Sequence, residues 1–341
     1  MNRPLRTFVF AGMMALVTAP AAIAGGASFA VRPVTFRPSV PATQSYFIFD
    51  AAPGRTIRSE VRVTNAGTAT GSALLYPVDA VTGQTSGAVY LSRTARRRDV
   101  GRWTRLDVTK VTLAPQKSTV IRFTVTVPAS VSPGSHLGGI VAENLAIDAT
   151  KKKRARNSFQ IRVRHLSIVA LEVNLPGAQV EQLGLGTVTA GSTGSFPTAQ
   201  LALRNAGTLI LKPSGKIRIA TMGGRAIEQQ QLHLDTFIPR TAIDYPVVLP
   251  KRLRAGRYRA EVTLGYGHGR LLRATRTLNI SDAQAQHWLA GSAPAAASSS
   301  ADSGGIGVVP WIVTAVAIGF AVGGIALALR SRRRRGATTE S

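Results

Sequence analysis

The residue types that most often carry out chemistry in proteins are sparse and scattered in this sequence. It contains no cysteine, which excludes a thiol nucleophile and disulfide bonds. No G-x-S-x-G turn of a serine hydrolase occurs. His233 and Asp235 would share one face of a strand, but two ligands do not make a metal site. Asp79, Asp99 and Asp107 show no spacing that pairs them. We therefore expect a protein that is not an enzyme and uses no cofactor or metal ion.

Positive charge is the dominant chemical feature of the chain. It has 42 lysines and arginines against 16 aspartates and glutamates, a formal net charge of +26. Such a surplus favours anionic partners, which include cell-wall polymers, lipid headgroups and nucleic acid. Because the sequence also begins with an export signal, we expect no nucleic-acid partner.

Three clusters of basic residues lie between expected strands. The candidate contacts with an anionic polymer are Arg96, Arg97, Arg98, Lys151, Lys152, Lys153, Arg154 and Arg156. The candidates for steering an acidic protein partner are Lys251, Arg252, Arg254 and Arg257. Solvated loop tips are the alternative interpretation of these clusters.

The elements that must position these clusters are β-strands. Apolar and polar residues alternate over 56–65 and 118–127, with Val61, Val63, Ile121, Phe123 and Val125 on the inward face. The opposite faces carry polar and charged residues, and 158–173 continues the pattern as a third long strand. No segment between the two termini shows a sustained helical period, so we expect cores without helix. Residues 28–173 are predicted to form an immunoglobulin-like β-sandwich.

A second unit with the same architecture is predicted at residues 174–281. Asn-Ala-Gly-Thr occurs at 65–68 and again at 205–208, each time after an alternating strand. Its expected core includes Leu201, Leu203, Val262 and Leu264, and Tyr258 after a glycine turn resembles a tyrosine corner. The fold class is therefore all-β, with two tandem immunoglobulin-like sandwiches and one C-terminal transmembrane helix.

The two ends of the chain predict a surface protein. Residues 1–24 have the basic, apolar and A-x-A regions of a cleaved signal peptide. Residues 308–329 are uncharged and long enough to span a bilayer, and the arginines of the tail at 330–341 place that end in the cytoplasm. An Ala/Ser/Pro-rich flexible stalk is expected at 282–307. We expect a cell-membrane protein with its N-terminal part outside.

Residues 46–142 resemble the peptidoglycan-binding domain of the WxL-interacting proteins. The resemblance is carried by YFIFDAAPGRTIRSEVRVTNAGT, by LAPQKSTVIRFTVTVP and by PGSHLGGI. Residues 180–281 are similar to that family's second, host-binding domain through GLGTVTAG and LRAGRYRAEVTLGY. The resemblance implies peptidoglycan as a ligand and a secreted WxL-type protein as a possible partner.

Two functions follow from these features. The first is adhesion, in which the protein tethers the cell wall, and a secreted partner, to the membrane. The alternative is a structural or chaperone-like scaffold of a surface complex, in which the charge only matches a phosphate-rich environment.

Overall fold

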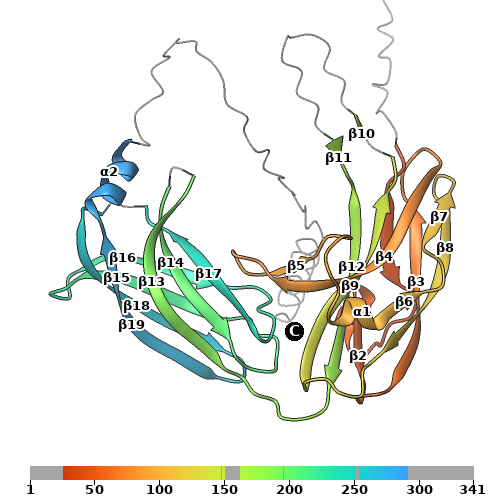
Figure 1. Cartoon of the computed structure of the whole chain (residues 1–341), viewed down its shortest axis with the longest axis horizontal. Coiled ribbons are helices and arrows are strands. Elements are labelled where there is room, and N and C mark those ends of the chain that lie inside the picture. The colour runs from red at the N-terminus through yellow and green to blue at the C-terminus, as the bar shows by residue number, and fades with distance from the viewer. Residues whose placement is uncertain (1–25, 147, 150–161, 195, 251–252, 291–341) are drawn as a thin grey trace, which may run out of the picture.

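The computed structural model describes residues 26–290 except 147, 150–161, 195 and 251–252. The described chain forms two β-sandwiches joined near Leu175, with short helices at their margins (Figure 1). Within this described part, no helix is long and apolar enough to cross a membrane. The predicted signal peptide, span and cytoplasmic tail lie outside the described residues, as do residues 291–307 of the predicted stalk.

The first sandwich consists of two main sheets. One is four-stranded, in the order β1 (Phe29–Pro33), β3 (Thr56–Asn65), β8 (Ser118–Thr126) and β6 (Thr104–Leu106). The other has the order β2 (Phe47–Asp50), β12 (Leu166–Leu175), β9 (Gly134–Asn144), β4 (Gly71–Thr82) and β5 (Ala88–Tyr90), with β7 (Lys110–Leu113) also paired to β4. A separate ribbon pairs β10 (Asp148–Ala149) with β11 (Arg162–Val163).

The second sandwich has one three-stranded and one four-stranded sheet. The first has the order β13 (Leu183–Thr193), β14 (Phe196–Asn205) and β17 (Thr241–Val248). The second has the order β16 (Ala226–His233), β15 (Ser214–Thr221), β18 (Gly256–Tyr266) and β19 (Arg270–Ile280). The three helices of the described chain are η1 (Pro41–Gln44), α1 (Val100–Trp103) and α2 (Asp282–Ala290).

The predicted core residues lie in the two cores. The five of the first sandwich are at most 5% exposed, and the four of the second are at most 1% exposed. Burying each such side chain contributes roughly 1.5–3 kcal/mol relative to leaving it in water. The tyrosine corner is also confirmed, because the Tyr258 hydroxyl donates to the Arg254 carbonyl at 2.9 Å.

The prediction that the cores lack helix is wrong at two places. Val100 and Trp103 of α1 belong to the first core, and Trp288 of α2 is 1% exposed in the second. The Trp288 indole N–H lies 3.0 Å from the Ser192 hydroxyl and 3.2 Å from the Gly191 carbonyl. Helix α2 therefore packs on the second sandwich where a stalk was expected. The sequence does not reveal this helix, because one large buried side chain in nine residues does not form a helical apolar period.

The third long strand also begins later than predicted. Strand β12 starts at Leu166, whereas Arg162 and Val163 pair with β10 in the separate ribbon. Residues 158–161 of the predicted strand lie outside the described residues.

The repeated Asn-Ala-Gly-Thr motif forms the same turn in both sandwiches. The Asn65 amide donates to the Ala69 and Leu113 carbonyls at 2.8 and 2.9 Å, and its oxygen accepts the Gly67 N–H at 3.0 Å. Asn205 bonds equivalently to Leu209, Phe237 and Gly207, at 2.9, 2.9 and 3.0 Å. Both asparagines are fully buried. In the first sandwich the motif thus connects β3 to β7 of the other sheet, and in the second it connects β14 to the isolated bridge at Phe237.

The two sandwiches touch through specific hydrogen bonds. The Thr82 hydroxyl accepts the Ile238 N–H at 2.9 Å and lies 2.7 Å from the Thr241 hydroxyl. The Ser135 N–H donates to the Thr208 carbonyl at 2.8 Å. This close approach needs Gly134, because a Cβ there would lie 2.0 Å from the Thr208 oxygen, at a φ of +102°. The contacts fix β9 and the end of β4 against the second sandwich.

Candidate functional site

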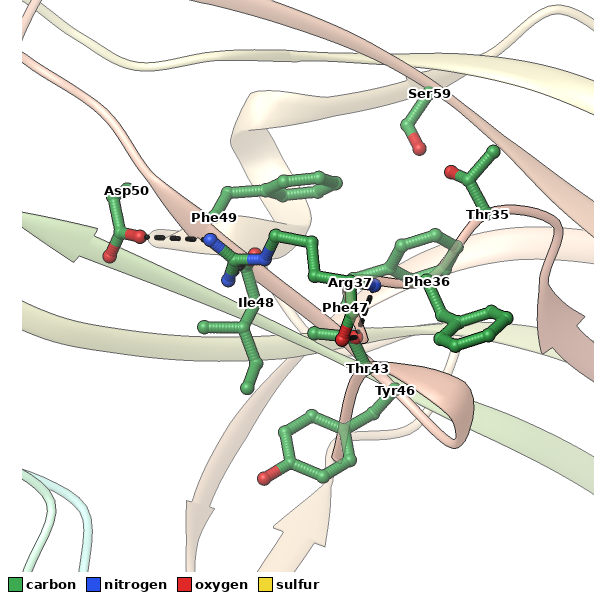
Figure 2. A pocket seen from close by; sticks show the side chains of 10 residues that line it. All are labelled: Thr35, Phe36, Arg37, Thr43, Tyr46, Phe47, Ile48, Phe49, Asp50 and Ser59. Carbon is green, nitrogen blue, oxygen red and sulfur yellow. Dashed lines mark hydrogen bonds and ion pairs between the residues drawn. The ribbon is translucent and has the colours of Figure 1, made fainter. Parts of the chain in front are cut away.

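A pocket of about 430 Å³ opens at the edge of the first sandwich, where β1 leaves β3. Its lining comes from β2, from the loop that precedes β2, and from Ser59 of β3 (Figure 2). We call this pocket the groove and residues 34–46, which border it, the strap. Phe47 and Phe49 form its inner wall, since both rings contact the core residue Phe123 at centroid distances of 5.0 and 6.5 Å.

One buried hydroxyl fixes the internal conformation of the strap. Thr43, 5% exposed, accepts the Arg37 N–H at 2.8 Å and donates to the Val40 carbonyl at 2.7 Å. Pro38 and Pro41 further restrict the backbone of this segment. The strap therefore presents its side chains from a constrained loop, which lowers the entropic cost of binding.

The groove combines aromatic surface with one cationic group. Phe36 is 51% exposed, and Tyr46 is half-buried at the rim. Arg37 reaches across toward Asp50, with an N···O distance of 3.4 Å, and donates to the Ile48 carbonyl at 3.1 Å (Figure 2). Both charged side chains remain exposed, so their ion pair contributes little stability. The guanidinium keeps donors available for a carboxylate or hydroxyl of a ligand.

Next to the groove, a cluster of titratable groups includes Tyr46, Tyr90 and Glu172. Burial, together with nearby Tyr46 and Glu172, raises the pKa of Tyr90 to about 12. Burial also raises the pKa of the Glu172 carboxyl, and that of Tyr46, where Glu172 adds to the shift. Gly139 of β9 makes room for the Tyr90 ring, because a Cβ at that position would lie 2.9 Å from it. The cluster is thus packed against the sheet and supports the rim of the groove.

A histidine–aspartate pair lies in the first sandwich beside the domain contact. His136 Nδ1 is 2.8 Å from the Asp99 carboxylate, and Nε2 is 2.9 Å from the Ser132 carbonyl. Asp79 accepts the N–H groups of Asp99 and Gly101, so the fold brings together two carboxylates that their sequence spacing did not pair. The Nε2 atom that a general base would use faces a backbone carbonyl in a side chain 4% exposed. This geometry positions α1 and provides no nucleophile activation.

Of the predicted contact residues, the structure describes five, all exposed and divided between the two sandwiches. Arg96, Arg97 and Arg98 are exposed in the turn before α1. Lys151–Lys153, Arg154 and Arg156 lie outside the described residues, as do Lys251 and Arg252. Arg254 and Arg257 are exposed at the start of β18. His233 and Asp235 are exposed, and the described residues hold no group of three potential metal ligands.

Comparison with protein families identifies the domain that holds the groove. Residues 29–144 match the family model described as WxL Interacting Protein, peptidoglycan binding domain. Over these residues the first sandwich is similar to the peptidoglycan-binding domain of the WxL-interacting proteins. This confirms the resemblance inferred from the sequence for this part of the chain. The matched residues include the strap, β2 and the PGSHLGGI segment, whereas β12, which completes the sheet, follows them.

Several solved structures show distant similarity to this chain. A chaperone–tip adhesin complex of CFA/I fimbriae matches with 12% identity and a TM-score of 0.37, covering 73% of this chain and 98% of that chain. The class 5 fimbriae chaperone CfaA matches with 11% identity and a TM-score of 0.36, over 73% and 99%. The E. coli chaperone DraB gives 14% identity and a TM-score of 0.32, over 75% and 98%. The search of curated proteins finds no match.

Sequence reasoning missed the groove. Phe36, Arg37 and Asp50 come from a loop and a four-residue strand, neither of which has a periodic pattern. The available signal was the density of aromatic residues, with Phe36 followed by Tyr46, Phe47 and Phe49. From the sequence alone these aromatic residues could equally belong to the core. They indicate an exposed apolar surface only because the structure places the strap at an open edge of the sandwich.

Proposed function

We propose that the protein is a non-enzymatic cell-surface adhesion protein that binds peptidoglycan through the groove of its first sandwich. The observation that carries this proposal is the match of residues 29–144 to a peptidoglycan-binding domain. The groove lies within the matched residues and is the concave site that the strap and β2 form.

The chemistry of the groove suits this ligand. Peptidoglycan consists of sugar chains with short peptides that carry carboxylates. The exposed faces of Phe36 and Tyr46 offer apolar surface for a sugar ring, and Arg37 offers charge-assisted hydrogen bonds to a carboxylate. Recognition of this kind should depend less on salt than the binding of a polyanion does, because Arg37 is the one cationic side chain of the groove lining.

The remaining parts of the proposal concern attachment and partners. Residues 308–329 would anchor the protein in the cell membrane, with the two sandwiches outside. The second sandwich would bind a secreted WxL-type protein, whose extended segment could add to an exposed sheet edge. In the described chain, β16 and β19 are the edge strands of its larger sheet, and Arg254 and Arg257 lie near one end of that sheet.

The test uses the full chain solubilised in detergent and peptidoglycan that has been chemically stripped of attached anionic polymers. We expect the protein to sediment with the stripped peptidoglycan at both low and high salt, and not with cellulose, which lacks the peptides. If stripped peptidoglycan retains no protein at low salt, the adhesion proposal fails. In that case the scaffold alternative would be preferred.

A further inference from the structure

The outer face of the sheet β1-β3-β8-β6 carries a concentration of arginines that the groove does not use. Because side chains alternate along each strand, the residues between the core positions of these strands point to solvent. We call this set of exposed residues the arginine face: Arg32, Arg58, Arg62, Arg105 and Arg122. Two acidic residues, Glu60 and Asp107, share the face. Five positive charges therefore meet two negative ones on one sheet surface.

The strand register places these arginines next to one another. Arg32 lies directly opposite Arg62 across β1 and β3. Arg58 and Arg105 flank Thr124 from its two sides. Neighbouring strands are separated by about 5 Å, so the face presents guanidinium groups rooted at spacings of roughly 5–10 Å. Within the described chain, only Arg122 of the five has a carboxylate within ion-pair distance, Glu60 at 3.6 Å.

This arrangement costs stability in the free protein. Like charges directly opposite each other on a sheet repel, and Arg32 and Arg62 form such a pair. Folding of the sheet does not require arginine, because Thr124 occupies an equivalent half-exposed position in the same face. A bound anion would remove the repulsion.

We propose that the arginine face binds a linear polyanion that carries a phosphate group in each repeat. This site lies on a different surface of the first sandwich from the groove, and its ligand is distinct from the glycan and peptide of the proposed function. The planar guanidinium fork pairs bidentately with phosphate oxygens, which makes arginine better suited to this task than lysine. A row of such groups on a flat sheet fits an extended chain with repeated charges.

A polymer fits this face better than a membrane surface or nucleic acid. Among the outward residues of these described strands, Val120 is the one large apolar side chain that is exposed, at 43%. The face therefore offers little apolar surface that could insert into a bilayer. The face also has no aromatic residue on which a nucleic-acid base could stack. Figure 1 shows β3 and β8 on the side of the first sandwich that faces away from the second sandwich. Helix α2 marks the end of that second sandwich.

The binding experiment uses the full chain in detergent and fluorescently labelled inorganic polyphosphate of fixed length. Anisotropy titrations over a salt series compare the wild type with R32Q/R62Q. The matched control is R204Q/R273Q, which removes two exposed strand arginines from the second sandwich. We expect R32Q/R62Q to weaken binding about tenfold at low salt and to reduce the slope of log K against log salt by about 1.5. The control should stay within about twofold of the wild type.

Two further measurements keep the outcome interpretable. Thermal melting without polyphosphate should show R32Q/R62Q to be at least as stable as the wild type, because a repulsive pair is lost. Phe36→Ala should bind polyphosphate normally, so failure at the groove and failure at the arginine face can be told apart. Equal losses in the two double variants would overturn the proposal. So would tighter binding to phosphatidylglycerol vesicles, or to single-stranded DNA of equal charge, than to polyphosphate.

Discussion

At the scale of single residues, the buried asparagines of the two NAGT turns are the most constrained polar groups. The Asn65 side chain makes four hydrogen bonds to backbone groups, and the Asn205 side chain makes three. Asn65→Ala would leave two carbonyls, of Ala69 and Leu113, and two N–H groups, of Ser28 and Gly67, without this partner. We expect a loss of about 2–4 kcal/mol in the free energy of unfolding, measured by urea denaturation.

The control for this prediction is Asn279→Ala, at an exposed position of β19. It should change stability by less than about 0.5 kcal/mol. Similar small losses for both variants would show that the Asn65 network is not a stabilising feature of the turn.

At the scale of elements, the sheet face beside the groove predicts a specific response to alkaline pH. The pKa of Tyr90 is raised from 10.0 to about 12, so the folded protein holds this proton more tightly than the unfolded chain does. Its contribution is fully present below pH 10 and is lost as the pH rises through 12. Between pH 10 and 12 the titration of Tyr90 should lower the free energy of unfolding by about 2 kcal/mol, and Tyr90→Phe should abolish this loss. Urea denaturation of both proteins at pH 9 and pH 11.5 measures the difference. An identical loss of stability in the two proteins would contradict the packing of Tyr90 described above.

The elements that could be predicted from the sequence are those with a local period. Val61, Val63 and Phe123 were placed in the core because alternation repeats every two residues within one strand. Helices α1 and α2 are too short to show a period, although Trp103 and Trp288 pack into the cores. The groove and the arginine face could not be predicted because each depends on how separate segments meet. Arg32 and Arg62 become neighbours only through the β1–β3 register.

At the scale of the whole molecule, the hydrogen bonds between the sandwiches predict a fixed relative orientation. Thr82, 9% exposed, is the acceptor for the Ile238 N–H and the partner of the Thr241 hydroxyl. Thr82→Val keeps the shape but leaves that N–H unpaired, which costs about 1–3 kcal/mol. We expect small-angle scattering to show a broader distribution of interdomain distances in this variant.

Thr126→Val serves as the matched control, because Thr126 makes an exposed hydroxyl contact with Thr56 within the first sandwich. Its scattering profile should equal that of the wild type. If the Thr82 variant also scatters like the wild type, the threonine contact does not hold the two sandwiches together.

The central claim, that the groove binds peptidoglycan, is tested most directly by one pair of variants. Phe36→Ala removes the exposed aromatic of the strap, and Phe196→Ala removes one that is 62% exposed on the second sandwich. We would measure the equilibrium affinity of each full-length variant for soluble, polymer-free peptidoglycan fragments. We expect Phe36→Ala to weaken binding by about tenfold or more, about 1.4 kcal/mol, and Phe196→Ala to bind as the wild type does. Unchanged affinity in Phe36→Ala, or the same loss in both variants, would contradict the claim.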